Sequence, residues 1–294
     1  MKVLFIYNPY AGKTQIKNHL YDILNIFSNY DLTVVPTNRQ GQAKTYIKEN
    51  YSKYELIICS GGDGTLNEVV NGLFINGGDN IPNIAYIPAG STNDFASSIK
   101  LPKSMSSAAK LIIDGKPKAY DVGKFNNSYF IYVAAFGAFT DVSYATPQEK
   151  KNVLGHFAYL IEGLKSISSI KSYKVKVISD DLVIEDNFIY GMITNTYSVG
   201  GLYKLDKKEV KLDDGYFEVL LIKEPKDIID LNNITSYLLG TIKESNLVYS
   251  FKTKKISLYT KEEMPWTLDG EYGGSPSIVE VENLNKAINI INKK

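Results

Sequence analysis

A glycine-rich turn between a buried strand and a helix constrains this chain more than any other feature. The apolar run 56–59 leads directly into Ser-Gly-Gly-Asp-Gly-Thr-Leu-Asn-Glu-Val-Val-Asn-Gly at residues 60–72. Such a run, bounded by glycines, is typical of a buried parallel strand, and the apolar spacing from Leu66 onward predicts a helix. Glycines let a ligand approach the main chain closely, and the amides at a helix N-terminus favour anions. The turn therefore predicts an anion-binding site.

A carboxylate, Asp63, stands inside this turn. An acid beside a phosphate repels it unless a metal ion or a hydroxyl group intervenes. The turn therefore indicates a nucleotide phosphate with Mg²⁺ nearby. An ordinary strand-to-helix turn is the alternative, and the four residues Gly-Gly-Asp-Gly alone leave both interpretations open.

A second glycine segment follows another apolar strand at residues 84–87. It reads Pro-Ala-Gly-Ser-Thr-Asn-Asp-Phe-Ala at residues 88–96. Four strand–helix units in succession predict a doubly wound parallel sheet, which binds ligands at the carboxyl ends of its strands. Both glycine segments lie at such ends, so one pocket can use both. Asp94 is then a candidate for metal or substrate positioning, or else the N-cap of the next helix.

Together these segments resemble the diacylglycerol kinase catalytic domain family, which includes soluble bacterial lipid kinases and is related to sphingosine kinases. Gly-Gly-Asp-Gly-Thr is shared with NAD kinases, and phosphofructokinases carry a related loop. Residues 8–12 resemble the Asn-Pro-x-x-Gly motif of the family, and Ser91 replaces a family threonine but keeps its hydroxyl. The resemblance implies that the nucleotide is bound by Asn8, Pro9, Gly12, Lys13, Thr37, Gly61, Gly62, Asp63, Gly64, Thr65, Asn67, Glu68 and Ser91. A solvated lysine at position 13 and a helix-capping threonine at position 37 remain the alternatives.

The hydrophobic period changes near residue 120. Strand-like runs then follow one another, among them 129–133, 173–178, 188–193, 216–222 and 255–259, and they predict a mostly antiparallel β-sandwich. One helix, expected from Pro147 to about Ser168, interrupts them. The change of period places a domain boundary near residue 120, with an α/β domain over residues 1–120 and a β-rich domain over residues 121–284. The resemblance implies that the first domain binds the nucleotide, as in NAD kinase and phosphofructokinase, and that the second binds the lipid substrate. Residues 285–294 are expected to return to the first domain.

Three segments of the second half extend the resemblance. Residues 195–201 resemble an Asn-x-x-x-x-Gly-Gly turn, although residues 204–208 depart from the proline-containing loop that usually follows. The turn around Asp214 resembles a segment that holds a structural Mg²⁺ in some relatives, which implies ligation by Asp214 and by the backbone carbonyls of Lys211 and Tyr216. An ordinary acidic hairpin turn is the alternative.

The last motif is Trp-Thr-Leu-Asp-Gly-Glu at residues 266–271. The resemblance places its two acids, Asp269 and Glu271, at the γ-phosphate, where one of them acts as the general base. Which of the two does so is left open. The catalytic candidates are therefore Asp269, Glu271, Asp63 and Asp94.

Composition limits the partners of the chain. Its net charge of +1 argues against nucleic-acid binding, and its one cysteine excludes an internal disulfide. No apolar run reaches the length of a membrane span, so we expect a cytoplasmic protein that meets the membrane peripherally. Five lysines between residues 100 and 118 form the clearest basic stretch, and a homodimer is among the expectations.

The resemblance implies an ATP-dependent lipid kinase that uses Mg²⁺. Its expected reaction transfers the γ-phosphate to the hydroxyl of diacylglycerol and yields phosphatidic acid. The alternatives are a kinase of another lipid, such as a sphingoid base or a phosphatidylglycerol-like lipid, a kinase of NAD, or a catalytically silent regulator that binds lipid or nucleotide. NAD is disfavoured because the second half matches lipid kinases.

Overall fold

The computed structural model describes residues 1–75, 77–78, 80–138, 170–196, 198–199, 203–204 and 211–293. Its contacts divide the chain into two compact units. Unit 1 comprises Met1–Val122 and Lys286–Lys294, and unit 2 comprises Gly123–Asn285. Two strands, β5 (Lys116–Phe125) and β17 (Ile278–Asn292), have residues in both units.

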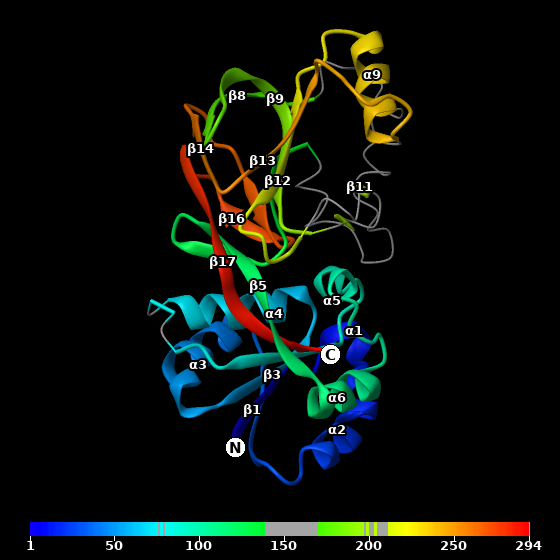
Figure 1. Cartoon of the computed structure of the whole chain (residues 1–294), viewed down its shortest axis with the longest axis vertical. Coiled ribbons are helices and arrows are strands. Elements are labelled where there is room, and N and C mark those ends of the chain that lie inside the picture. Colours follow the sequence, from blue (N-terminus) through cyan, green and yellow to red (C-terminus); the bar gives the residue numbers. More distant parts are fainter. Residues whose placement is uncertain are drawn as a thin grey trace. The chain divides into compact units, whose positions relative to one another are not determined.

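Unit 1 alternates strands and helices (Figure 1). Its remaining strands are β1 (Lys2–Tyr7), β2 (Asp31–Pro36), β3 (Leu56–Gly61) and β4 (Asn83–Pro88). Its helices are α1 (Ala11–Thr14), α2 (Leu20–Ile26), α3 (Gln42–Asn50), α4 (Asp63–Phe74), α5 (Asp94–Ser98) and α6 (Met105–Asp114). Two short 3₁₀ turns complete it, η1 (Gln15–Asn18) and η2 (Tyr51–Lys53).

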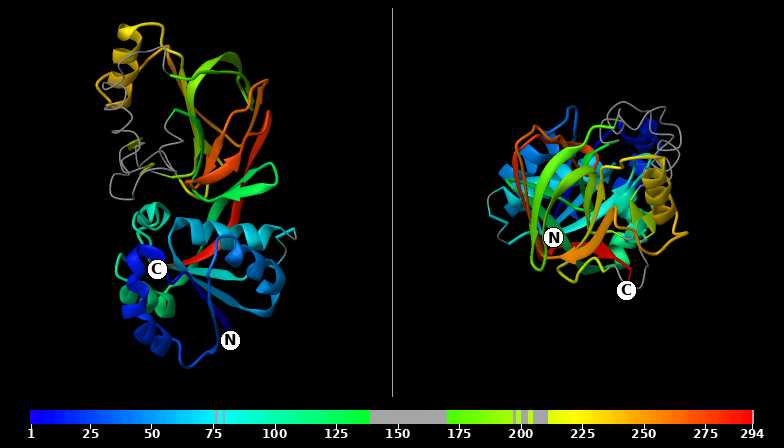
Figure 2. Two further views of the ribbon diagram at one scale, coloured as in Figure 1. Left: turned by 180° about the vertical axis from the view of Figure 1, so that it is seen from behind. Right: turned by 90° about the horizontal axis from the view of Figure 1, so that it is seen from above.

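The sheet of unit 1 is parallel and runs in the order β17-β4-β3-β1-β2. Alternate residues of β1 point to opposite faces, and Val3, Leu4, Phe5 and Ile6 are all fully buried. Helices α2 and α6 contribute to the core with Val3 and Phe5, whereas α3 and α4 lie on the other face (Figures 1 and 2). The predicted doubly wound parallel sheet is confirmed.

Unit 2 is built mainly from antiparallel strands, as predicted. They are β6 (Ser128–Phe130), β7 (Val133–Gly137), β8 (Tyr173–Ser179), β9 (Val183–Thr194), β12 (Phe217–Lys223), β13 (Val248–Thr253), β14 (Lys255–Thr260), β15 (Trp266–Leu268) and β16 (Glu271–Gly274). A short pair, β10 (Ser198–Val199) with β11 (Tyr203–Lys204), and one helix, α9 (Ile228–Leu238), complete the described part.

The long strand β9 organises unit 2. Its first half pairs with β8, and its second half lies between β7 and β12. Further pairing gives the order β16-β15-β7-β9-β8-β14-β17, with β13 against β12. The core is aromatic: the ring of Trp266 lies 5.0 Å from that of Phe125 and 4.9 Å from that of Phe136.

One strand prediction in unit 2 is wrong in detail. The continuous strand expected over residues 129–133 is interrupted at Ile131 and Tyr132, between β6 and β7. The backbone N–H groups of both residues turn instead to the carboxylate of Asp269. At these two residues, a side-chain carboxylate accepts the hydrogen bonds in place of a neighbouring strand.

Several predictions lie outside the described residues. These are the helix from Pro147 to Ser168, most of the segment 204–208, and residues 197, 200 and 201 of the Asn-x-x-x-x-Gly-Gly turn. Within the described ranges, we find no helix with the length and apolar character needed to cross a bilayer.

Candidate active site

The loops that follow the parallel strands of unit 1 meet at one edge of the sheet. The N–H of Thr37, after β2, donates to the carbonyl of Tyr7 at the end of β1 (2.8 Å). The N–H of Asn8, after β1, donates to the carbonyl of Ser60 near the end of β3 (2.9 Å). Each loop is therefore held by its neighbouring strand. Thr37 is buried, and its hydroxyl lies 3.3 Å from the same Tyr7 carbonyl.

The two glycine loops touch backbone to backbone. A Cβ added to Gly90 would lie only 2.5 Å from the Cα of Gly62. A Cβ on Gly12, whose φ is +54°, would lie 2.1 Å from the carbonyl oxygen of Ala89. Three predicted segments are thus packed so closely that side chains at Gly12 and Gly90 are excluded. Glycine at these two positions is therefore required for the loops to pack together.

A buried tyrosine and an asparagine hold the loop after β4 in place. The hydroxyl of Tyr86 donates to the carbonyl of Gly61 (3.1 Å) and lies 3.4 Å from Oδ1 of Asn93. The side chain of Asn93 also accepts the N–H of Gly90 (2.9 Å) and donates to its carbonyl (2.7 Å). Burial raises the pKa of Tyr86 well above its usual value, so this hydroxyl remains a donor.

Asp63 connects the two loops through its side chain. Oδ2 accepts the N–H of Asp94 at 3.0 Å, and Oδ1 accepts the N–H of Phe95 at 3.4 Å. These are the first N–H groups of α5, so Asp63 supplies the capping oxygens, while Asn93 occupies the N-cap position itself with φ 52°. The alternative of Asp94 as N-cap is therefore wrong, because Asp94 is the first residue of the helix.

Glu68, a residue of α4, caps the start of α3 in a similar way. Its Oε1 accepts the N–H of Gly41 (2.7 Å), and its Oε2 accepts the N–H of Ala43 (3.0 Å). Gly41 is the N-cap of α3, with φ 80°. A residue expected among the nucleotide contacts is therefore engaged at the start of a neighbouring helix, and its predicted contact with the nucleotide remains a prediction.

The remaining predicted nucleotide contacts occupy the same region. Thr65 is buried in the first turn of α4, and Oδ1 of Asn67 accepts a hydrogen bond from Asn71 (3.0 Å). Ser91 is exposed and lies between Gly90 and Asn93 in the loop after β4. The segment from Asn8 to Gly12 begins with a turn in which Asn8 Oδ1 accepts the N–H of Tyr10 (2.9 Å). Pro9 lies in this turn, Gly64 lies in the first turn of α4, and the side chain of Lys13 is outside the description.

The two acids of the last motif lie in unit 2 and have contrasting surroundings. Asp269 is only 4% exposed, and its φ is 50°. Its Oδ2 accepts the N–H of Ile131 (2.7 Å), and its Oδ1 accepts those of Tyr132 (3.0 Å) and Val133 (3.1 Å). A carboxylate with three amide donors stabilises the turn, and taking up a proton would disrupt these bonds. Glu271, by contrast, is exposed at the start of β16.

Acidic and basic side chains lie together around the turn that contains Asp214. Oδ1 of Asp214 accepts the N–H of Tyr216 (3.1 Å), and Oδ2 lies 3.9 Å from the ammonium of Lys252. The same ammonium forms an ion pair with the buried Glu218 at 3.1 Å. Burial raises the pKa of Glu218 to about 7, against the opposing effect of Lys252. One lysine thus faces two acids. The described residues contain no cluster of three or more His, Cys, Asp or Glu side chains suited to a metal.

Sequence reasoning missed two residues that shape the site. Tyr86 gave no signal, because an aromatic residue in a buried strand is ordinary core and nothing in the pattern reveals where its hydroxyl points. Asn93 offered a weak one, since asparagine is enriched at left-handed backbone positions next to helix starts.

Comparison with known proteins covers both units. The model of the family "Diacylglycerol kinase catalytic domain" matches residues 2–125. The chain is 38% identical over 275 residues to a diacylglycerol kinase of Staphylococcus epidermidis, covering 92% of this chain and 85% of that one. It is 34% identical over 295 residues to the diacylglycerol kinase of Bacillus subtilis, covering 98% and 95%.

Two crystal structures of Bacillus anthracis proteins match nearly the whole chain. The first has a TM-score of 0.82 and 30% identity, and it covers 99% of this chain and 97% of the other. The second, of a diacylglycerol kinase, has a TM-score of 0.75 and 28% identity with the same coverage. The likeness therefore includes the β-rich unit as well as the glycine loops.

Proposed function

This chain belongs to the diacylglycerol kinase family and is an ATP-dependent lipid kinase, and we propose that its substrate is diacylglycerol. The reaction would transfer the γ-phosphate of ATP to the free hydroxyl of the lipid, leaving ADP and phosphatidic acid. The observation that carries this proposal is the close contact of Gly62 with Gly90 at the sheet edge, in a chain that resembles diacylglycerol kinases over nearly its full length.

Unit 1 would bind the nucleotide through main chain. The positive end of the twelve-residue helix α4 begins directly after Gly62 and favours phosphate oxygens. Gly12 and Gly90 let the loops pack backbone to backbone, Gly62 has no other heavy atom of the described residues closer than 3.5 Å to the position of a Cβ, and Tyr86 and Asn93 keep the loops in place. A rigid arrangement suits phosphoryl transfer, in which catalysis is mainly positioning and neutralisation of charge.

We further propose that the nucleotide carries Mg²⁺ and that Asp63 and Asp94 face it. Both oxygens of Asp63 accept backbone N–H groups at the start of α5, and a carboxylate has about four acceptor sites in all. Capping α5 is therefore compatible with binding water molecules of a hydrated magnesium ion, which prefers oxygen ligands. The ion would neutralise negative charge on the phosphates.

Glu271 is the better candidate for the general base. A base must reach the hydroxyl that it deprotonates and must have room to accept the proton. Glu271 is exposed, whereas Asp269 is buried and accepts three backbone N–H groups. We propose that Asp269 holds the turn and that Glu271 accepts the proton from the lipid.

A structural Mg²⁺ at the Asp214 turn is a separate proposal. Lys252 neutralises one of the two neighbouring acids, so a further cation is electrostatically acceptable there. Asp214 and the carbonyls of Lys211 and Tyr216 would hold the ion, and its role would be to stabilise this turn.

Because diacylglycerol resides in membranes, the kinase would act at a membrane surface as a peripheral protein. The decisive experiment incubates the purified chain with radiolabelled ATP and Mg²⁺ and offers diacylglycerol or a sphingoid base in mixed micelles, or NAD in solution. We expect labelled phosphatidic acid from the first reaction and little product from the others. Label in the sphingoid base or in NAD, with none in phosphatidic acid, would refute the proposed substrate. A Glu271→Gln variant is the control for contaminating kinases.

A further inference from the structure

Helix α9 of unit 2 exposes large aliphatic side chains that nothing in the proposed chemistry uses. Ile228 is 63% exposed, Ile229 is 73% exposed and Leu239, directly after the helix, is 60% exposed. Among the described residues, only one other Val, Leu or Ile reaches this level, namely Val183 at 65%. Three of the four most exposed aliphatic side chains among the described residues therefore lie on α9 or directly after it.

The exposed aliphatic side chains stand at the two ends of α9 and on its outer side. Within the helix, Leu231, Ile234 and Thr235 are buried. Ile228 and Leu239 are eleven residues apart, which is about three helical turns, so they project in nearly the same direction. Both lie close to the direction of the buried Thr235 and stand at the two ends of the helix. Ile229 lies about 100° around the helix from Ile228, on the side opposite Leu231 and Ile234.

The exposed face of α9 carries almost no charge. No charged residue occurs from Leu231 to Ile242, and the outward positions within the helix, such as Asn232 and Ser236, are neutral. A surface helix of a globular protein normally presents charged and polar residues opposite its apolar stripe. The one charged residue inside the helix, Asp230, accepts the N–H of Lys226 (2.8 Å) as part of the helix start.

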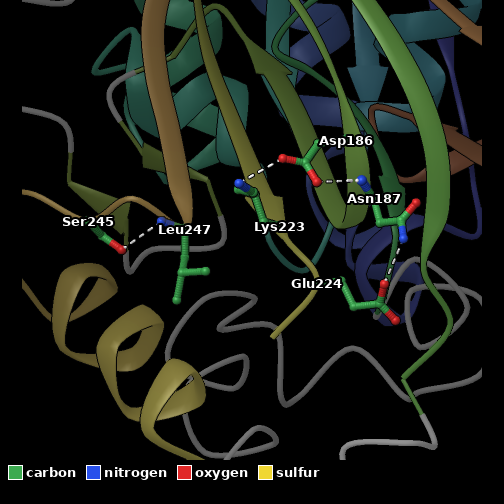
Figure 3. Close-up of polar contacts among 6 residues, drawn as sticks. All are labelled: Asp186, Asn187, Lys223, Glu224, Ser245 and Leu247. Atoms are coloured by element: carbon green, nitrogen blue, oxygen red, sulfur yellow. Dashed lines mark hydrogen bonds and ion pairs between the residues drawn. The ribbon is translucent and has the colours of Figure 1, made fainter. Parts of the chain in front are cut away.

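The segments on either side of α9 are held by polar contacts (Figure 3). Before it, Lys223 forms an ion pair with Asp186 (2.7 Å), and Glu224 accepts a hydrogen bond from the side chain of Asn187 (3.0 Å). After it, the hydroxyl of Ser245 accepts the N–H of Leu247 (3.1 Å) and donates to Asn233 within α9 (2.6 Å). Because these contacts hold the segments that flank α9, little ordering is required when its aliphatic side chains are buried.

We infer that the outer face of α9, with Ile228, Ile229 and Leu239, inserts into the apolar boundary of a lipid bilayer and docks the kinase on the membrane that contains its substrate. The inference rests on the proposed lipid substrate. A neutral face with exposed branched aliphatic side chains gains by leaving water for the headgroup and acyl boundary, in proportion to the apolar area buried.

Charge at the ends of α9 predicts how salt affects this docking. The exposed Lys226 and Lys243 are accompanied by Asp227 and Glu244, so the ends contribute no net positive charge. Docking through α9 therefore depends on apolar contact and persists at high salt, where attraction between a basic patch and anionic lipid is screened. The lysines between residues 100 and 118 of unit 1 would give the opposite salt dependence.

The test measures binding of the full chain, without ATP, to neutral phosphatidylcholine vesicles containing diacylglycerol, at low and high salt. We compare the wild type with the double variant Ile228→Ser/Ile229→Ser, with Leu239→Ser, and with Val183→Ser as a matched control. Each buried CH₂ group strengthens partitioning about fourfold, so the double variant should bind at least about tenfold more weakly. Leu239→Ser should also weaken binding, and Val183→Ser should behave like the wild type.

Three results would overturn the inference: equal binding by the wild type and the correctly folded α9 variants, binding of the wild type only to anionic vesicles at low salt, or no binding at all. Thermal melting shows whether each variant is folded. If the double variant is unfolded, binding by Leu239→Ser decides the question.

Activity on a short-chain diacylglycerol dissolved as monomers separates this inference from the proposed function. The α9 variants should keep that activity and lose activity on vesicles. If the wild type phosphorylates neither form of the lipid, the proposed substrate is wrong, while the binding measurement still decides whether α9 docks.

Discussion

The carboxylate of Asp63 accepts the backbone N–H of Asp94 at 3.0 Å, across 31 positions of the chain. The acid in the first glycine loop thereby sets the start of the helix that carries the acid of the second. Any change at Asp63 has two separable effects, one on the cap of α5 and one on the charge near the phosphates.

Two substitutions at Asp63 separate these effects. Asp63→Asn keeps one acceptor oxygen and removes the charge, so we expect a small change in stability and about a 10- to 100-fold loss of kcat. Asp63→Ala removes the acceptors as well and should cost about 1 kcal/mol more in the free energy of unfolding. Denaturant unfolding and steady-state kinetics test this. If the two variants are equally stable, the cap contributes nothing.

Gly62→Ala should weaken binding of ATP without disturbing the fold. The added Cβ would have only the Cα of Gly90 within 4 Å, at an ordinary 3.5 Å, and Gly62 does not have a positive φ. Titration calorimetry measures the affinity, and thermal melting checks the fold. The reciprocal variant Gly90→Ala should be destabilised, because its Cβ would lie 2.5 Å from the Cα of Gly62. Unchanged affinity for ATP in Gly62→Ala would exclude the phosphate site drawn from this loop.

Glu68→Ala should act on stability more than on the nucleotide. It removes both acceptors at the start of α3, which should lower the free energy of unfolding by about 1 to 2 kcal/mol. Glu68→Gln keeps one acceptor and should fall between the wild type and Glu68→Ala. We expect the KM for ATP to change little in either variant. A large rise in that KM with normal stability would instead place Glu68 among the nucleotide contacts, as the sequence predicted.

Substitutions of the two acids of the last motif should also separate an effect on activity from an effect on stability. Glu271→Gln should lower kcat by about 10²- to 10⁴-fold, the range for loss of a general base, and leave the melting temperature unchanged. Asp269→Asn should lower the melting temperature, because an amide oxygen cannot accept the three N–H groups that the carboxylate accepts. Full activity in Glu271→Gln would reject its assignment as the base.

Asp214→Ala tests the proposed structural magnesium. A ligand that binds only the native state raises its stability by mass action, so Mg²⁺ should raise the melting temperature of the wild type more than that of the variant. Ca²⁺ at the same concentration serves as a comparison, since Mg²⁺ demands the stricter geometry. Equal shifts on addition of Mg²⁺ to both proteins would show that this turn binds no stabilising ion.

Much of unit 1 was predictable because β2, β3 and β4 are short strands that end at glycine or proline. The run 56–59 became β3, and the helix after it begins at Asp63 rather than at the first apolar residue, Leu66. Backbone turns of this kind follow from local chemistry. The side-chain partners of the loops did not follow, because Asp63 and Glu68 bond to backbone groups that lie far from them in the sequence.

In unit 2, too, contacts between residues far apart in the sequence could not be predicted. Alternating residues predicted β8 and β14 well, yet the break between β6 and β7 depends on Asp269, which lies 138 positions after Ile131. The local propensity of residues 129–133 gives no information about this carboxylate, because only the folded topology brings Asp269 close to them. For the same reason, the sequence could not decide between Asp269 and Glu271, since both flank one glycine and their burial alone distinguishes them.

Strand β17 has a consequence for biosynthesis and for any attempt to divide the chain. Its residue Ile290 pairs with Ile84 of β4, so the sheet of unit 1 is completed by residues that the ribosome makes only after all of unit 2. Vectorial folding of unit 1 must therefore wait, with one edge of β4 uncovered while unit 2 emerges. A fragment cut at residue 125, where the family match ends, would keep that bare edge permanently and should aggregate.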